Sequence, residues 1–259
     1  MDMKSHEFFS SIAEAYKQFR PTYPSSLVAA ILAEQTPSRD LFVDVACGSG
    51  QLTSLLAPAF KQSVGVDKGV GQIAQAKIGS LSVEFMEGDA HKLPLPSDAA
   101  DLLTCAQALH WFLDDQTFSE FRRVLKTDGL LAVASYAFAN PLDEHIKQAF
   151  NHFYFDRLGS HLPLGSPGCF WQCDRRVVDS GYAEVAWPEN FGLVSRTQFP
   201  TQLTLTKAAY MSYVKTFSAL ENLKTADVDP VEELDAAIGN VESVELSVIF
   251  SLTLLRKRS

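Results

Sequence analysis

The chain has few cysteines, no excess of basic residues and no long hydrophobic run. Four cysteines among 259 residues are too few for a secreted scaffold held by disulfides, and Cys169 and Cys173 lack the second pair or the histidine that a zinc site requires. The formal net charge of −9 argues against wrapping nucleic acid. The longest apolar stretch begins at Leu246 and is far shorter than the roughly 20 residues that span a bilayer. We therefore expect no metal site, no nucleic-acid partner and no membrane segment.

The composition is that of a globular protein. Hydrophobic residues make up 46% of the chain and charged residues 20%, which excludes disordered and collagen-like classes. The first residues have neither the apolar centre of a secretion signal nor the arginine-rich pattern of a transit peptide, so we expect a cytoplasmic protein. The length fits one main domain with an appendage.

Short aliphatic runs alternate with helical patterns in the first half of the chain. The expected strands span residues 41–45, 63–67, 82–87, 101–107 and 130–136. The expected helices between them span residues 51–59, 70–78 and 116–126. Nearly all-apolar strands that alternate with helices indicate a parallel sheet covered on both faces. The sequence therefore predicts a doubly wound α/β core.

The alternation stops at Pro141. A helix is expected over 143–158, followed by a loop rich in Gly and Pro and by an aromatic stretch. Two long alternating strands, 195–206 and 242–256, then flank a helix over 207–223. Such strands can pair as an antiparallel edge of the sheet. Because residues 141–192 interrupt the alternation, we expect them to form an inserted lid over the carboxyl edge of the sheet.

The loop after the first strand contains Asp44, Gly48 and Gly50. Open parallel sheets bind ligands outside the carboxyl ends of their strands, and glycines let the backbone approach the ligand closely. Two alternatives fit: a dinucleotide site, or a site for a nucleoside that carries an amino acid. The third glycine of the dinucleotide motif is absent, because Gln51, Leu52 and Thr53 follow Gly50.

Acidic residues end three successive expected strands: Asp44, Asp67 and Asp89. Asp44 suits an ammonium group and would repel a pyrophosphate. Asp67 can accept hydrogen bonds from both hydroxyls of a ribose, and Asp89 is placed to meet an adenine edge. Each acid alone is typical of a turn or a helix cap, but the three together favour the amino-acid nucleoside.

The segments VDVACGSGQ, GVDKGVGQIAQAK, EGDAHKLPLP and DLLTCAQALHWF, in this order, resemble class I S-adenosylmethionine-dependent methyltransferases over residues 12–137. The ALHW sequence after the fourth expected strand and the upstream YKQFRPTYP are most similar to small-molecule enzymes related to trans-aconitate methyltransferases. The resemblance implies a Rossmann-like sheet of seven mostly parallel strands with an antiparallel edge strand. It divides one domain, 1–259, into a helical cover (1–40), a cofactor-binding core (41–137), the lid, and a C-terminal helix with edge strands (193–259).

The resemblance also implies a set of residues for the cofactor, S-adenosylmethionine. Asp44, Gly48 and Gly50 line its methionine end, and Asp67 holds its ribose. Lys68 and Gln72 flank the adenine, while Asp89 and Ala90 contact its edge. The chain departs from the family at Ala46, where a glycine is common, and at Gln72, where an apolar residue commonly packs on the adenine.

Methyl transfer from a sulfonium depends mainly on orientation, with a base only where the nucleophile must lose a proton. Gln107, assigned to the cofactor, His110 and Trp111 follow the fourth expected strand, where the reactive methyl group points. His110 can deprotonate a hydroxyl or orient a substrate acid, and Trp111 can form a pocket wall; a packed histidine and a core tryptophan are the alternatives.

The resemblance folds the N-terminal helix over the cofactor, so Tyr16 and Arg20 join the cofactor site, and either can bind a carboxylate; a surface arginine is the alternative. Phe170, Trp171 and Tyr182 can roof a substrate pocket. We therefore expect a methyltransferase for a small molecule, with carboxylate O-methylation favoured by family analogy. The alternative is a catalytically silent cofactor-binding or partner-binding protein of the same fold.

Overall fold

The computed structural model describes residues 19–34, 36–79, 82–223 and 229–258. These residues form an eight-stranded sheet with the order β3-β2-β1-β4-β5-β8-β6, and β7 pairs with the free side of β8. The strands are β1 (Leu41–Val45), β2 (Gln62–Asp67), β3 (Glu84–Glu87), β4 (Ala100–Ala106), β5 (Leu125–Tyr136), β6 (Asn140–Pro141), β7 (Phe191–Thr206) and β8 (Ser243–Lys257). Strands β1 to β5 are parallel, whereas β8 is antiparallel to β5, β6 and β7. The predicted fold class, with its antiparallel edge, is confirmed.

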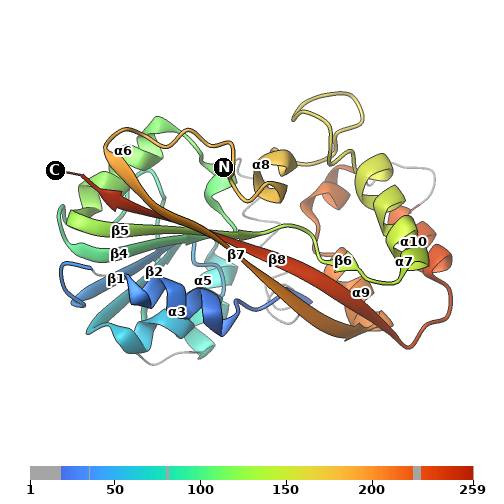
Figure 1. Ribbon diagram of the computed structural model, residues 1–259, viewed down its shortest axis with the longest axis horizontal. Helices are drawn as coiled ribbons and strands as arrows, with labels where there is room; N and C mark the ends of the chain where they lie inside the picture. The colour runs from blue at the N-terminus through green and yellow to red at the C-terminus, as the bar shows by residue number, and fades with distance from the viewer. Residues whose placement is uncertain (1–18, 35, 80–81, 224–228, 259) are drawn as a thin grey trace.

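Helices cover both faces of this sheet (Figure 1). Phe42 and Val43, adjacent on β1, point to opposite faces and belong to two separate buried clusters. The cluster around Phe42 includes Leu27 and Leu52, and that around Val43 includes Phe118. One face is covered by α3 (Ser25–Ala33), α4 (Gln51–Leu56), η1 (Ala57–Ala59) and α5 (Val70–Gly79), and the other by α6 (Asp115–Val124) and α8 (Arg175–Asp179).

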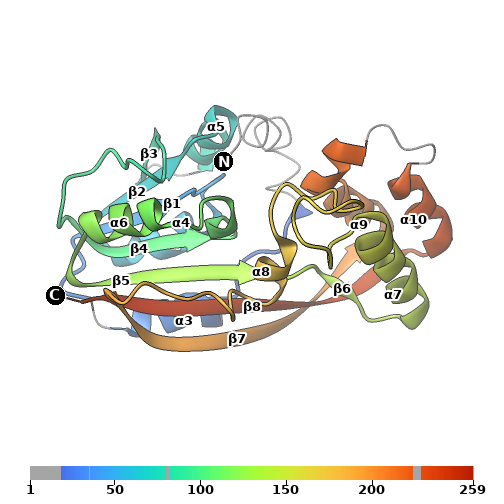
Figure 2. The same cartoon turned by 90° about the horizontal axis from the view of Figure 1, so that it is seen from above.

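A group of helices lies beyond the carboxyl ends of the parallel strands (Figure 2). Strand β8 leaves β5 at the pair Tyr136–Phe250, and its preceding residues pair only with β6 and β7. Five helical elements pack around this part of the sheet: α7 (Glu144–Asn151), the π-helix η3 (His152–Arg157), α9 (Lys207–Val214), η4 (Ser218–Leu223) and α10 (Pro230–Ile238). We call these five elements the helical region.

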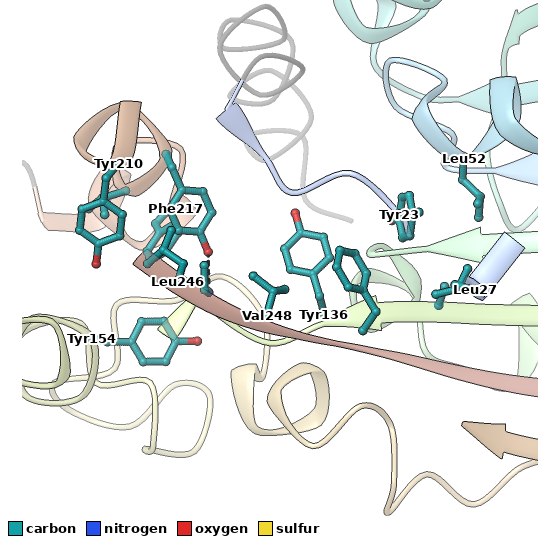
Figure 3. Packing of buried hydrophobic residues seen from close by; sticks show 14 of the residues in the cluster. Tyr23, Leu27, Leu52, Tyr136, Tyr154, Tyr210, Phe217, Leu246 and Val248 are labelled. Atoms are coloured by element: carbon teal, nitrogen blue, oxygen red, sulfur yellow. Dashed lines mark hydrogen bonds between the residues drawn. The ribbon is translucent and has the colours of Figure 1, made fainter. Parts of the chain in front are cut away.

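The helical region shares one continuous core with the sheet (Figure 3). Leu246 of β8 lies near Phe217 and Tyr210, whereas Val248 lies beside Tyr136 at the end of β5. Large side chains of this kind stabilise a fold by about 1.5–3 kcal/mol each when fully buried. The helical region and the sheet are therefore stabilised by one common cluster of buried side chains.

Several expected boundaries differ from the structure. The helix expected to end at Lys126 ends at Val124, because Leu125–Tyr136 is one strand. The expected helices 143–158 and 207–223 each divide in two. The short strand β6 raises the strand number from seven to eight, and α10 was not expected. None of the described helices is long and apolar enough to cross a membrane.

Candidate active site

The loop after β1 is built from residues in the left-handed backbone region. Ala46, Gly48 and Gly50 have φ angles of 53°, 55° and 78°. A Cβ atom on Gly50 would lie 2.8 Å from the ring of Phe85, so this position admits only glycine without a shift of that ring. Ala46 adopts the conformation for which a glycine is common in the resembling family. The loop thus keeps its shape at a cost in strain.

A cavity opens where this loop meets the ends of β2 and β4, with the loop after β3 on its rim. Eight of the eleven residues expected at the cofactor line it directly: Asp44, Gly48, Asp67, Lys68, Gln72, Asp89, Ala90 and Gln107. Gly50, behind the loop, and Arg20 are not among its lining residues. Tyr16 lies outside the described residues. Trp111 also lines the cavity, beside Tyr23 and Tyr136.

Asp44 is almost fully buried on the face of β1 that α4 covers. The hydroxyls of Thr53 and Thr104 each donate to one of its oxygens at 2.5 Å. Burial raises the pKa of Asp44 to about 6, with the two hydroxyls opposing the shift and the charge of Asp67 adding to it. The carboxyl group therefore loses its proton close to neutral pH.

Asp67 joins two loops at the end of β2. One carboxylate oxygen accepts from the backbone N–H of Gly48 at 2.8 Å, and the other accepts from that of Gly69 at 2.7 Å. Charge-assisted bonds of this kind fix a carboxylate firmly. A carboxylate oxygen has further acceptor capacity, so Asp67 can also bind hydroxyl groups in the cavity.

Asp89 is held by its neighbours on two sides. Lys68 donates to it at 3.1 Å, and the backbone N–H of His91 donates to it at 2.9 Å. Partial burial raises the pKa of Asp89, but these donors outweigh it and lower the pKa to about 2. The His91 ring lies between Asp89 and Asp114, the N-cap residue of α6, at 3.0 and 2.9 Å.

Gln107 ties the end of β4 to the end of β5. Its side-chain amide donates to the carbonyl of Tyr136 at 3.0 Å, and its side-chain oxygen accepts from the N–H of Tyr136 at 2.8 Å. Its own backbone is left-handed, with a φ of 53°. Gln107 thus holds Tyr136 in the wall of the cavity. No pattern in the sequence of β5 indicates that Tyr136 lines the cavity.

His110 lies in η2 (Leu109–Trp111), beside the cavity but not among its lining residues. Its ring lies 5.4 Å from that of Trp111 between centroids. The hydroxyl of Tyr182 lies 2.9 Å from Nδ1 of His110. Burial lowers the pKa of His110 well below its usual range, and the positive charges of Arg175 and Arg20 lower it further. The imidazole is therefore neutral at neutral pH.

Arg20 joins the end of β5 to the helical region. Its guanidinium donates to the hydroxyl and the carbonyl of Thr216 at 2.9 and 3.0 Å, and to the hydroxyl of Tyr136 at 3.5 Å. Its Cζ atom lies 5.5 Å from the ring centroids of both Tyr213 and Phe217. Arg20 thus contacts both Tyr136 of the cavity wall and the aromatic residues Tyr213 and Phe217.

Of the aromatic residues expected at the substrate pocket, Trp111 lines the cavity, whereas Phe170, Trp171 and Tyr182 do not. Trp171 is buried in the core, where its ring nitrogen donates to Ser160 at 2.7 Å. The Cζ atom of Arg175 lies 4.9 Å from the Trp171 ring. Phe170 is half-buried against the same cluster. Their aromatic character reflects packing of the inserted segment, and Arg175, which the sequence analysis did not single out, is the charged group beside them.

Comparisons with known proteins match the chain to methyltransferases. A family model described as a methyltransferase domain matches residues 43–133. A Dictyostelium discoideum protein named as a methyltransferase is 33% identical over 183 residues, which cover 70% of this chain and 66% of that protein. CRG1 of Saccharomyces cerevisiae, named as an S-adenosylmethionine-dependent methyltransferase, is 27% identical over 146 residues, 54% of this chain and 50% of that protein. The chain thus spans about half to two thirds of the length of these curated relatives.

A solved structure described as a type II methyltransferase from Anaeromyxobacter dehalogenans superposes with a TM-score of 0.72 at 28% identity, covering 93% of this chain and 98% of that one. The chain belongs to the class I S-adenosylmethionine-dependent methyltransferase superfamily. Its cofactor is S-adenosylmethionine. The residues around the cavity fit this group, because Gly48 leaves its loop open and Asp44 and Asp67 offer carboxylates to ammonium and hydroxyl groups. The described residues contain no cluster of three or more metal-ligating side chains.

Proposed function

We propose that the protein transfers a methyl group from S-adenosylmethionine to a carboxylate oxygen of a small molecule. The observation that carries this proposal is the position of Arg20, which donates to Tyr136 of the cavity wall and to Thr216 of the helical region. An arginine there can hold a carboxylate by its planar fork. The resemblance of the segments ALHW and YKQFRPTYP to trans-aconitate methyltransferases favours the same class of acceptor by analogy. The four cysteines are free thiols, which supports a reducing compartment such as the cytoplasm.

The roles of the cavity residues follow from their bonds. We assign the methionine end of the cofactor to Asp44 and the loop of Gly48 and Gly50, and the ribose to Asp67. We assign the adenine to Lys68 and Gln72, and its edge to Asp89 and Ala90. Tyr16 is assigned to the cover of the cofactor. The shared lining of one cavity supports these assignments apart from those of Gly50 and Tyr16, which rest on the family resemblance.

S-adenosylmethionine supplies an electrophilic methyl group on a sulfonium, and a carboxylate oxygen that takes this group leaves a neutral thioether and releases no proton. The chain therefore needs to bind and orient the acceptor rather than remove a proton from it. Arg20 binds the acid, His110 orients it, and Trp111 closes the wall between His110 and the cofactor. His110 and Trp111 are in ring contact, which couples these two positions.

We also propose that part of residues 141–192 closes over the acceptor. Because the helices of this segment are buried in the shared core, the moving part is the exposed loop from His161 to Gly168. Leu164 is half-exposed there. Chymotrypsin should cut after Leu164 in the free protein and more slowly with S-adenosylhomocysteine and an acid acceptor bound. Leu164→Ala should abolish this cut, and an unchanged rate with both ligands present would exclude closure of this loop.

Two measurements test the proposed reaction. Calorimetry should detect binding of S-adenosylmethionine and S-adenosylhomocysteine but not of NAD. Incubation with methyl-labelled S-adenosylmethionine and a panel of small carboxylic acids should then give labelled esters that mild alkali hydrolyses. Label in an alkali-stable product would exclude ester formation, and binding without transfer to any acceptor would favour the catalytically silent alternative.

A further inference from the structure

The hydroxyl of Tyr182 makes two hydrogen bonds with one residue, His110. Tyr182 follows α8 and is almost fully buried. Its oxygen lies 2.9 Å from Nδ1 of His110 and 3.3 Å from the backbone nitrogen of His110. A backbone N–H can only donate, so in the second contact the hydroxyl oxygen is the acceptor.

The proton of this hydroxyl then determines the state of the imidazole. Among the residues that the structure describes, Nδ1 of His110 is the acceptor within hydrogen-bond reach of the Tyr182 hydroxyl. If Nδ1 carried a proton, two donors would face the same oxygen and the buried hydroxyl proton would be left without a partner. A buried polar group in that state is costly. The arrangement is fully paired only when Tyr182 donates to an unprotonated Nδ1.

We infer that Tyr182 is a positioning residue that fixes His110 as the neutral tautomer with its proton on Nε2, so that His110 offers the acceptor a hydrogen-bond donor and not a base. The role toward the acceptor rests on the proposed function; the tautomer does not. A donor suits an acceptor that is already ionised, such as a carboxylate, and does not suit an alcohol that must lose its proton.

The surroundings of His110 support this state. Arg175 and Arg20 both bring positive charge towards the ring, and together with burial they lower its pKa. A second proton is therefore disfavoured at neutral pH. The same two charges favour an anionic partner at the remaining nitrogen.

The backbone around Tyr182 is shaped to deliver its hydroxyl to this place. Gly181 and Tyr182 are consecutive left-handed residues, with φ angles of 65° and 60°. A Cβ atom on Gly181 would lie 2.3 Å from Oγ of Ser251 on β8, so the chain passes tightly over the sheet at this point. A non-glycine residue with positive φ is uncommon. The strain at Tyr182 is tolerated where its ring packs 6.4 Å from that of His110.

Nuclear magnetic resonance of protein labelled with ¹⁵N-histidine tests the tautomer directly. The chain has six histidines, and comparison with His110→Gln identifies the signals of His110. We expect Nε2 protonated and Nδ1 unprotonated in the wild-type protein at neutral pH, with or without S-adenosylhomocysteine. Tyr182→Phe should shift the Nδ1 resonance and mix the two tautomers. A protonated Nδ1 in the wild-type protein would overturn the inference, even if the variant fails to fold.

Tyr210→Phe is the matched control, because the Tyr210 hydroxyl is also buried and has no hydrogen-bond partner in the described part of the chain. Its removal should leave the His110 spectrum unchanged. With an active acid acceptor, Tyr182→Phe should raise KM about two- to tenfold, the range of one hydrogen bond, and leave the Kd of S-adenosylhomocysteine unchanged. The expected tautomer with an unchanged KM would overturn the donor role of His110 while leaving its protonation state as inferred.

Discussion

Acidic side chains line the cofactor cavity, whereas two arginines, Arg20 and Arg175, contact residues of the helical region. Asp44, Asp67 and Asp89 line the cavity, and their oxygens accept from hydroxyl, backbone and lysine donors. On the other side, Arg20 and Arg175 lie against aromatic rings. An anionic cavity suits a cofactor with ammonium and sulfonium groups, and a cationic wall suits an acid acceptor. This difference fits the proposed reaction, in which a positively charged cofactor and an acid acceptor bind at separate places.

Arg20 and Arg175 differ in where their side chains lie. Arg175 is buried and donates to Asp179 at 2.6 Å and to the hydroxyl of Tyr154 at 3.0 Å. Its ion pair belongs to the core of the inserted segment. Arg20 donates to Thr216 and to Tyr136, and Tyr136 lines the cavity. Its position beside the cavity wall makes Arg20 the better candidate to bind a substrate acid.

The largest effect is expected from Asp67→Ala, which tests the anionic side. It removes the carboxylate assigned to two ribose hydroxyls, each bond to a charged group being worth about 1.5–3 kcal/mol. The Kd of S-adenosylhomocysteine measured by calorimetry should therefore rise on the order of a hundredfold or more.

The control for this change is Asp40→Ala, which removes a surface carboxylate paired with Lys61 at 2.7 Å. That variant should bind the cofactor like the wild-type protein. A Kd within threefold of wild type for Asp67→Ala would show that the ribose is held elsewhere.

The cofactor half of the molecule is predictable from sequence because its signals are local. Strand β1 spans the residues expected for it, and the acids that end β1 and β2 line one cavity. Backbone geometry explains this success: parallel strands end at a common edge. The loop after β1 needs glycine at Gly50, and such a requirement is visible in the sequence itself.

The acceptor half is less predictable because its contacts join residues far apart in the chain. Trp171 is an aromatic residue of the kind that lines pockets, but in the structure it is buried in the core. Nothing near Arg20 indicates that it bonds Thr216, 196 residues away. The bond between His110 and Tyr182 likewise spans 72 residues. Helix α10 did have a local signal, Asp229 before Pro230 and Gly239 after its end, which is typical of a capped helix.

A smaller effect, dependent on pH, is expected at Asp44. Its pKa is about 6 in the folded protein and near 3.9 in an unfolded chain. Between these values the folded state binds more protons, so the contribution of Asp44 to stability is greatest at low pH and falls as pH rises through 6, by at most about 3 kcal/mol. Binding of the positively charged cofactor should strengthen over the same interval, because it favours the ionised carboxylate.

Asp44→Asn separates the contribution of this residue from those of other titrating groups. The free energy of unfolding of each protein is measured in denaturant at pH 5 and pH 7.5. As pH rises, we expect the free energy of unfolding of the wild type to fall relative to that of Asp44→Asn. Calorimetry at the same two pH values should give a flatter pH dependence of cofactor binding in Asp44→Asn. Equal pH dependence in the two proteins would mean that Asp44 does not titrate in this interval.

The smallest effect is expected from Arg20→Ala, which tests the cationic side. Loss of the guanidinium should raise KM for an acid acceptor about tenfold, or about 1.4 kcal/mol, with little change in kcat or in the Kd of the cofactor. Arg20→Lys should fall between wild type and Arg20→Ala, because it keeps the charge and loses the planar fork. Steady-state kinetics with varied acceptor concentration measures this series.

Arg20 also contacts the helical region, so stability must be separated from binding. Thr216→Val removes the hydroxyl to which Arg20 donates and keeps the charge of Arg20 in place. If Arg20 acts on the acceptor, Thr216→Val should lower the melting temperature with a smaller rise in KM than Arg20→Ala causes. If KM instead rises in proportion to the loss of stability in both variants, Arg20 joins the sheet to the helical region without binding the acid. The positive charge of Arg20 would then have a structural role alone.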